Sequence, residues 1–209
     1  MSDLQALHEA IVKGDRNRAK QLVQQQIDAG TDPQQILDAM TGAMDDIGAK
    51  FQANEVFVPE MLIASRAMKE AMAVLEPVLV DAGIRPAFTA VVGTVQGDLH
   101  DIGKNLVAMM WKGANFGVVD LGTNVTPDQF AAAAKKHKAR IVGLSALLTT
   151  TMPAMKTTIE AIKKAGLTEA KVVIGGAPIT KEFADQIGAD GYAPDAAGAV
   201  QVVRDLMSV

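Results

Sequence analysis

The chain has 209 residues, 49% of them hydrophobic, and a formal net charge of −4, so its length suggests one large domain or two small ones with buried cores. It contains no cysteine, which excludes disulfides, thiolate zinc sites, iron–sulfur clusters and a cysteine nucleophile. The sequence has no basic tract, apolar leader or membrane-spanning run, so we expect a cytoplasmic protein that binds neither nucleic acid nor membrane.

Helical periodicity runs through residues 1–82. Apolar residues recur three or four positions apart after Pro33 and again after Pro59, and a proline suits the first turn of a helix. Two shorter helical stretches precede them and end at Gly14 and Gly30. Four helices with short connections predict an antiparallel four-helix bundle as the first domain.

The period changes after a linker at residues 83–87. From there on, short β-branched runs alternate with helical stretches, at residues 88–93, 117–121, 140–144, 171–174 and, weakly, 191–193. This alternation predicts a second domain at residues 88–209, a Rossmann-like, doubly wound five-stranded parallel sheet. Ligands of such sheets bind at the carboxyl ends of the strands, which is where the polar motifs of this chain fall.

One motif follows the first predicted strand and opens a helix: Gly97-Asp98-Leu99-His100-Asp101-Ile102-Gly103-Lys104-Asn105. It places one imidazole between two carboxylates, and a histidine held by a neighbouring aspartate is a basic, well-oriented metal ligand. Taken by itself, the motif fits equally a turn histidine that bonds Asp98 only to stabilise the turn.

Two other kinds of site fit the sequence poorly. A phosphate-binding loop would have four residues where five lie between Gly97 and Gly103, and a serine or threonine in place of Asn105. Zinc and non-haem iron need three or four side-chain ligands, whereas His8 and His137 are expected on the surfaces of helices. One histidine suffices only where a cofactor supplies the remaining ligands, as a macrocycle does.

Three motifs together resemble those of cobalamin-binding domains. In that family the signature D-x-H-x-x-G is followed by S-x-L and then by a Gly-Gly pair. The chain has all three in this order, at Asp98-x-His100-x-x-Gly103, Ser145-Ala-Leu147 and Gly175-Gly176, with 41 and then 27 residues between them. The chain is similar to the stand-alone corrinoid proteins of anaerobic methyltransferase systems, and to the helical-cap and cobalamin modules of methionine synthase.

The resemblance implies cobalamin or a related corrinoid as cofactor, held base-off and His-on, in methylated or Co(I) forms. His100 would be the lower axial ligand of cobalt, Asp98 would accept the other ring N–H of His100, and Thr151 would end this relay. Ser145 and Thr149 would hydrogen-bond the displaced nucleotide tail. The full set of expected cofactor contacts is Asp98, His100, Asp101, Ile102, Gly103, Ser145, Leu147, Thr149, Gly175 and Gly176, with Phe51, Val58 and Met61 of the helical cap over the upper face.

The glycines and the cap have implied roles as well. By the resemblance, Gly175 and Gly176 leave room for the tail because a side chain there would clash with it, and Gly103 lets the backbone approach the cofactor. An apolar cap would keep water and oxidants away from the reactive upper face of the cobalt.

The resemblance further implies a methyl-carrying corrinoid protein, a component of a methyltransferase system rather than a complete enzyme alone. Its partners would be a donor-specific methyltransferase, a second methyltransferase acting on tetrahydrofolate or coenzyme M, and a reductive activator of the corrinoid. Three alternatives stay open: an adenosylcobalamin-binding subunit of a carbon-skeleton mutase, a cobalamin-binding sensor, and a protein that binds no corrinoid.

Overall fold

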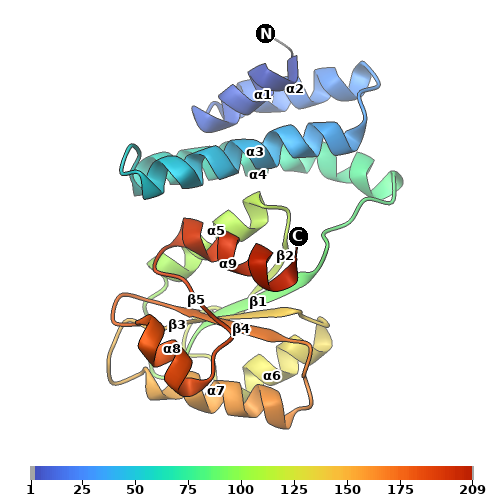
Figure 1. The fold of residues 1–209 in the computed structure, drawn as a ribbon. Helices are drawn as coiled ribbons and strands as arrows, with labels where there is room; N and C mark the ends of the chain where they lie inside the picture. The colour runs from blue at the N-terminus through green and yellow to red at the C-terminus, as the bar shows by residue number, and fades with distance from the viewer. Residues whose placement is uncertain (1–2, 209) are drawn as a thin grey trace. The chain divides into compact units, whose positions relative to one another are not determined.

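Four helices form the N-terminal part of the computed structural model, which describes residues 3–208 (Figure 1). They are α1 (Asp3–Val12), α2 (Arg16–Asp28), α3 (Pro33–Gln52) and α4 (Val58–Asp81). Side-chain caps explain why two of them begin where they do. Asp15 accepts the Arg18 N–H at 3.0 Å before α2, and Asp32 accepts the Gln34 N–H at 3.0 Å before α3.

The four helices pack as a bundle, with α1 against α2 and α3, and α4 against both α2 and α3. This confirms the predicted bundle. One prediction about it was wrong: His8 is not a fully solvated surface residue. Only 21% of its side chain is exposed, and its Nε2 lies 2.8 Å from the Asp46 carboxylate, because α1 packs directly on α3. The largest fully buried side chains of the bundle are Leu7, Ile11, Ile36, Leu37, Met40, Met44, Ile47, Met61 and Leu75.

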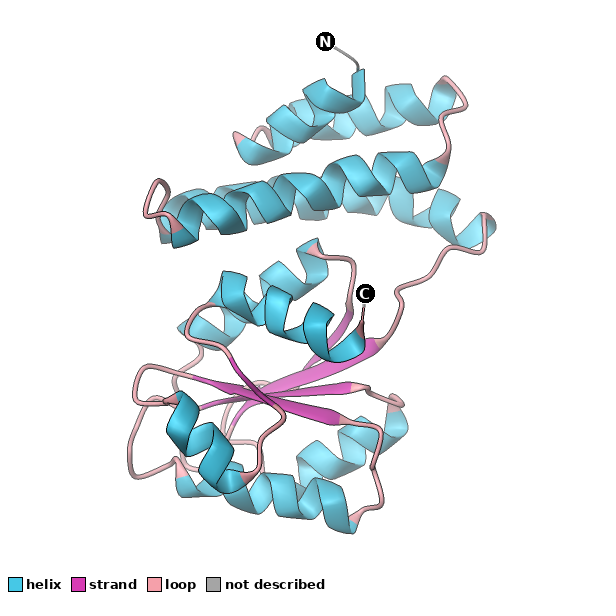
Figure 2. Ribbon diagram, in the orientation of Figure 1, coloured by secondary structure: helices cyan, strands magenta, loops and turns pink. Residues whose placement is uncertain are grey.

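Five parallel strands form the second part, in the order β2-β1-β3-β4-β5. Figure 2 draws the strands of this sheet in magenta. The strands are β1 (Thr89–Thr94), β2 (Gly117–Asp120), β3 (Ile141–Ser145), β4 (Lys171–Gly175) and β5 (Gly191–Tyr192). Helices α5 and α9 cover one face of the sheet, and α6, α7 and α8 cover the other (Figure 1). These helices are α5 (Ile102–Gly113), α6 (Pro127–Lys136), α7 (Pro153–Lys164), α8 (Lys181–Ile187) and α9 (Ala196–Met207).

Both faces of the sheet carry a buried core, as expected for a parallel sheet. Phe130 of α6 and Ile159 of α7 pack against the strands on one side. On the other side Trp111 of α5 is buried, and its indole N–H donates to the Ala199 carbonyl of α9 at 3.0 Å. The doubly wound sheet predicted from the sequence is therefore confirmed.

The strand order reverses between β1 and β3, which makes their carboxyl ends the topological switch point. Thr94 pairs with Ser145, and Ser145 with Gly175, across three neighbouring strands. This pairing extends β3 and β4 by one residue beyond the predicted ends, so Ser145 and Gly175 close their strands rather than follow them. The polar motifs therefore meet at one edge of the sheet.

The chain divides into two compact units. The first comprises the residues up to Pro86 together with Gly113–Asn115, and the second comprises Ala87–Lys112 and the residues from Phe116 onward. Across residues 3–208, every helix is too short or too polar to cross a membrane.

Candidate cofactor site

The loop between β1 and α5 carries His100 at the switch point. It begins with a tight turn in which the Asp98 N–H donates to the Val95 carbonyl at 3.1 Å. Gly97 in this turn has a φ of +86°, a conformation that side chains with a Cβ rarely adopt. The turn reverses the chain at the end of β1, and so leaves residues 98–101 at the carboxyl edge of the sheet.

His100 is held by Asp98 through two hydrogen bonds. Its Nδ1 lies 2.8 Å from Asp98 Oδ1, and its backbone N–H donates to the same oxygen at 3.0 Å. Because a carboxylate can only accept, Nδ1 carries a ring proton, and in the neutral ring the lone pair therefore lies on Nε2. Half of the His100 side chain is exposed, and no group within residues 3–208 bonds Nε2. The site thus offers one basic, oriented nitrogen to a metal.

The second oxygen of Asp98 holds the loop between β3 and α7. Asp98 Oδ2 accepts the Leu147 N–H at 2.8 Å, the Leu148 N–H at 3.2 Å and the Thr151 hydroxyl at 2.7 Å. The structure therefore brings Asp98, His100 and Thr151 together, as the expected relay requires. The two backbone amides were not foreseen, because a main-chain donor leaves no residue type in the sequence to recognise.

Asp98 is fully buried. Burial raises the pKa of its carboxyl, but hydrogen bonds from the His100 and Leu147 amides and the Thr151 hydroxyl outweigh this and hold the pKa well below its usual range. Asp98 is therefore a carboxylate at neutral pH. A buried carboxylate with five donors is a rigid anchor for the ring that it orients.

Several apolar side chains on the two loops at this edge are exposed. Leu99 is 72% exposed and Ile102 76%, and Leu147 and Leu148 are exposed on the facing loop. Isolated exposed leucines are ordinary, but several on the two loops that Asp98 joins are typical of a surface that an apolar ligand covers. Asp101, at the start of α5, is exposed and accepts the Asn105 side-chain amide at 3.0 Å.

The protein's own contacts require the two expected glycines but not the two expected hydroxyl groups. Ser145 and Thr149 have no hydrogen-bond partner for their hydroxyls within the described residues, so both are available to a ligand. A Cβ on Gly175 would lie 2.9 Å from the Ala193 carbonyl oxygen, and one on Gly176 would overlap the Ala146 carbonyl. These two glycines are thus required by close backbone packing, whether or not a ligand is bound.

Gly103 is different. A Cβ built there meets no protein atom within 4 Å, and the residue has an ordinary helical φ in the first turn of α5. The protein's own packing gives no reason for a glycine three residues after His100. The open space at Gly103, close in the sequence to one oriented imidazole and to the exposed side chains of Leu99 and Ile102, fits a large planar cofactor that brings its own equatorial ligands.

The three expected cap residues lie at one end of the bundle. Phe51 is in the last turn of α3, and Val58 and Met61 are in the first turns of α4. Phe51 and Val58 are half-buried and Met61 is buried. No cluster of three or more histidine, aspartate or glutamate side chains that could hold a metal occurs among residues 3–208.

The comparisons with known proteins match both parts of the chain. Residues 88–201 match a family model described as the B12 binding domain, and residues 3–76 match a second B12 binding domain model. A corrinoid protein of Desulfitobacterium hafniense strain Y51 is 37% identical, with 99% of this chain and 98% of that protein covered. Trimethylamine corrinoid protein 1 of Methanosarcina acetivorans is 37% identical, with 95% and 94% covered.

Solved structures are similar over the same span. A cobalamin-binding protein from Desulfitobacterium hafniense DCB-2 superposes with a TM-score of 0.81 at 31% identity, covering 99% of both chains. A chain of the methanol:cobalamin methyltransferase complex MtaBC from Methanosarcina barkeri superposes with a TM-score of 0.88 at 28% identity, covering 99% of this chain and 80% of that one.

The fold and the two matched domains define a corrinoid-binding protein with an N-terminal helical domain. Within this class, the chain belongs to the corrinoid proteins of methyltransferase systems, to which it is similar over nearly its whole length.

Proposed function

We propose that this chain carries a methyl group on the cobalt of a bound corrinoid, between a donor-specific methyltransferase and a second methyltransferase that acts on tetrahydrofolate or coenzyme M. The observation that carries the proposal is the imidazole of His100, fixed by Asp98 with Nε2 left free. Relatives named as trimethylamine and dimethylamine corrinoid proteins support a methylated small molecule as the donor. A chain of similar fold in a methyltransferase complex supports direct docking to such an enzyme.

His100 Nε2 is the proposed lower ligand of cobalt, in the base-off, His-on state. The displaced nucleotide tail would bind near Ser145 and Thr149, whose hydroxyls are free. Gly103, Leu99 and Ile102 would face the corrin ring, because they leave an open, apolar surface beside the imidazole. When bound, the corrinoid supplies a cobalt centre that accepts and donates methyl groups.

Asp98 sets the tautomer and the orientation of His100, the proposed ligand of cobalt. Asp98 keeps the ring proton on Nδ1 and so keeps Nε2 basic, and it also fixes the plane of the ring. Because Asp98 is a carboxylate in the cofactor-free protein, it holds His100 in this orientation before a corrinoid binds. A reductive activator is the further partner that this chemistry requires.

The absorption spectrum of the loaded protein tests the ligand. Cofactor-free protein is incubated with methylcobalamin, and His100→Ala is compared with wild type and with His137→Ala, an exposed histidine at the end of α6. We expect wild type and His137→Ala to give the His-on spectrum, and His100→Ala to bind the corrinoid without it. A His100→Ala spectrum equal to that of wild type would remove His100 as ligand.

The carrier role is tested with the same three proteins in the reduced state. They are incubated with methanol, methylamines, aryl methyl ethers or betaines together with extract of the source cells, and formation of the methylated corrinoid is followed. Wild type is expected to be methylated from one donor class. Turnover with adenosylcobalamin in place of methylated cofactor would contradict the carrier role and favour a mutase subunit.

A further inference from the structure

An ion pair between a buried lysine and a partly exposed aspartate lies beside the site and has no part in the proposed cofactor contacts. Lys104 in the first turn of α5 has a side chain only 2% exposed. Its ammonium lies 2.6 and 2.7 Å from the two carboxylate oxygens of Asp120, the last residue of β2, and 2.6 Å from Asn105 Oδ1. A lysine is rarely buried without a partner, because removing its charge from water costs several kcal/mol.

Asp120 in turn holds the chain just beyond β2. Its Oδ1 accepts the Gly122 N–H at 2.9 Å, where Gly122 has a φ of +80°. The carboxylate therefore joins the start of α5 to the turn at residues 122–124. Lys104 supplies the positive charge that lets this carboxylate sit partly buried at that junction.

The turn at residues 122–124 forms hydrogen bonds with the backbone of β1 and of the His100 loop. The Gly122 carbonyl accepts the Thr94 N–H at 2.9 Å, and the Asn124 N–H donates to the Asp98 carbonyl at 3.0 Å. The side-chain oxygen of Asn124 accepts the Gly97 N–H at 2.8 Å. The loop is thus held on one side by this turn and on the other by the amides that bond the Asp98 carboxylate.

We propose that Lys104 is a positioning residue for His100. Its pair with Asp120 fixes both the turn at residues 122–124 and the start of α5. The His100 loop is hydrogen-bonded to the first of these elements and continues into the second. The pair sets the place of the imidazole before any cofactor arrives. This inference rests on the proposed function, because the place of His100 matters for cobalt only if His100 is the ligand.

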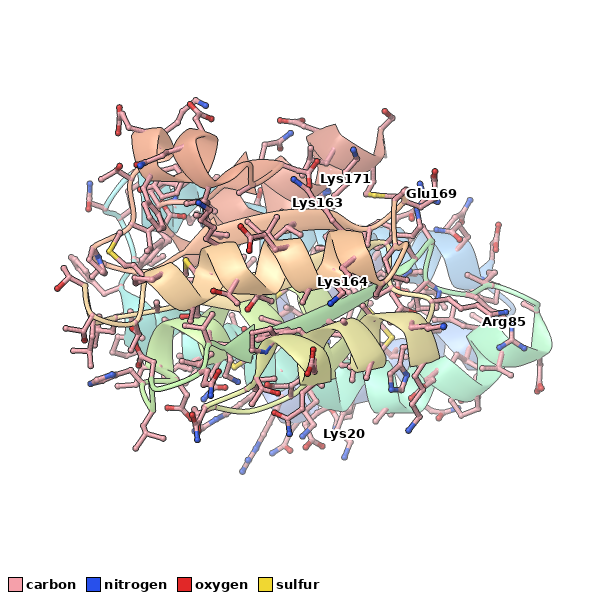
Figure 3. The ribbon with its side chains drawn as sticks, turned by 90° about the horizontal axis from the view of Figure 1, so that it is seen from below. Lys20, Arg85, Lys163, Lys164, Glu169 and Lys171 are labelled. Carbon is pink, nitrogen blue, oxygen red and sulfur yellow. The ribbon has the colours of Figure 1, made fainter. Side chains whose placement is uncertain are left out.

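The test compares Lys104→Met with Lys171→Met in the full-length protein. Lys171, on the surface at the start of β4 (Figure 3), lies 3.3 Å from Asp190, whose carboxylate also accepts a backbone N–H, that of Val172. The control pair therefore repeats the chemistry of the Lys104–Asp120 pair at the amino end of a strand, away from the His100 loop.

Two readouts separate positioning from stability. In the cofactor-free protein, hydrogen exchange of the Gly97 and Asn124 amides is measured by NMR. With methylcobalamin bound, the ratio of His-on to His-off protein is taken from the absorption spectrum. We expect Lys104→Met to speed both exchange rates and to lower the His-on ratio by about tenfold, as loss of groups behind a metal ligand typically does. Lys171→Met is expected to change neither.

A second variant guards against misfolding. Lys104→Met alone leaves a partly buried carboxylate unpaired, whereas Lys104→Met combined with Asp120→Leu removes both charges and is expected to fold. The double variant also loses the bond between Asp120 and the Gly122 N–H, so we expect faster exchange at Gly97 and a low His-on ratio even if its stability matches wild type.

Wild-type exchange rates and a wild-type His-on ratio in the double variant would overturn the proposal and leave the pair a purely structural one. The proposed function fails in a different way. Wild-type protein would then show no His-on spectrum at all, while the exchange rates in the cofactor-free protein would still report whether Lys104 positions the loop.

Discussion

At the scale of single residues, Asp98 joins two loops through one carboxylate. One oxygen takes the ring and the amide of His100, and the other takes two amides and the Thr151 hydroxyl from the loop after β3. Hydrogen bonds to a charged acceptor are stronger than neutral ones, and because Asp98 is fully buried, solvent does not readily replace a donor that is lost. Asp98, which orients the proposed ligand His100, therefore also holds the two loops together at the carboxyl edge of the sheet.

Replacing Asp98 with asparagine is expected to destabilise the cofactor-free protein. Asparagine has one acceptor oxygen, and its NH2 group would face donors, so a loss of about 1–3 kcal/mol in the free energy of unfolding follows. Urea unfolding at pH 7 measures it. The matched control is Asp185→Asn on α8, an exposed carboxylate paired only with Lys181, which is expected to change stability by less than about 0.5 kcal/mol.

The cost of Asp98→Asn has a defined pH dependence. The folded-state pKa of Asp98 lies below the unfolded-state value of about 3.9, so the carboxylate stabilises the fold above that pH and this stabilisation is lost as the pH falls further. The difference in unfolding free energy between wild type and Asp98→Asn is expected to stay constant above about pH 5 and to shrink below about pH 4. A difference that grows on acidification would contradict the assigned ionisation of Asp98.

At the scale of the elements, the sequence pattern predicts the strands and helices well, because apolar residues recur with a different spacing in each kind of element. β-branched runs separated by helical stretches place all five strands to within a residue or two. The motifs place Ser145 and Gly175 at the carboxyl edge of the sheet. The strand ends are less well predicted, because pairing with a neighbour extends a strand by a residue that the pattern alone assigns to a loop.

What the pattern misses are contacts between elements. Lys104 and Asp120 are 16 residues apart and carry no common motif, and only the packing of α5 beside β2 makes them partners. The same holds for the amides of Leu147 and Leu148, which any residue type could supply. His8 was misjudged for this reason too, since helix spacing alone does not say which helix faces which.

Two glycines at the ends of elements are expected to respond in opposite ways to alanine. Gly176, just after β4, has a φ of +134° and its Cβ would overlap the Ala146 carbonyl, so Gly176→Ala is expected to cost more than about 2 kcal/mol of stability. Gly103→Ala, in the first turn of α5, is expected to keep or raise stability by up to about 1 kcal/mol.

Gly103→Ala is expected to be harmful for corrinoid binding, although it is expected to keep or raise the stability of the protein. Since its Cβ would point into open space where the proposed cofactor would lie, Gly103→Ala is expected to weaken the binding of methylcobalamin, measured by absorbance titration. Gly42→Ala in the middle of α3 is the control, since its Cβ makes only ordinary contacts. A dissociation constant unchanged in Gly103→Ala would mean that the cofactor lies elsewhere.

At the scale of the whole molecule, the chain combines two units with separate cores, and the proposed function needs both. The sheet unit holds the imidazole, the free hydroxyls and the open apolar surface. The helical unit is proposed, from the resemblance to helical-cap modules, to cover the upper face of the corrin with Phe51, Val58 and Met61. These three residues share one end of the bundle, so their proposed role can be separated from that of the other end.

Hydrogen exchange followed by mass spectrometry tests this division of roles on the full-length protein. Methylcobalamin is expected to slow exchange in peptides from the two loops of the sheet edge, residues 95–103 and 145–151, because bound cofactor stabilises what it contacts. If the cap residues cover the cofactor, peptides spanning residues 51–61 slow as well, whereas peptides at the opposite end of α3, residues 28–36, keep their rates. Protection confined to the sheet edge would leave the cofactor bound but uncapped, and the roles of Phe51, Val58 and Met61 would fall.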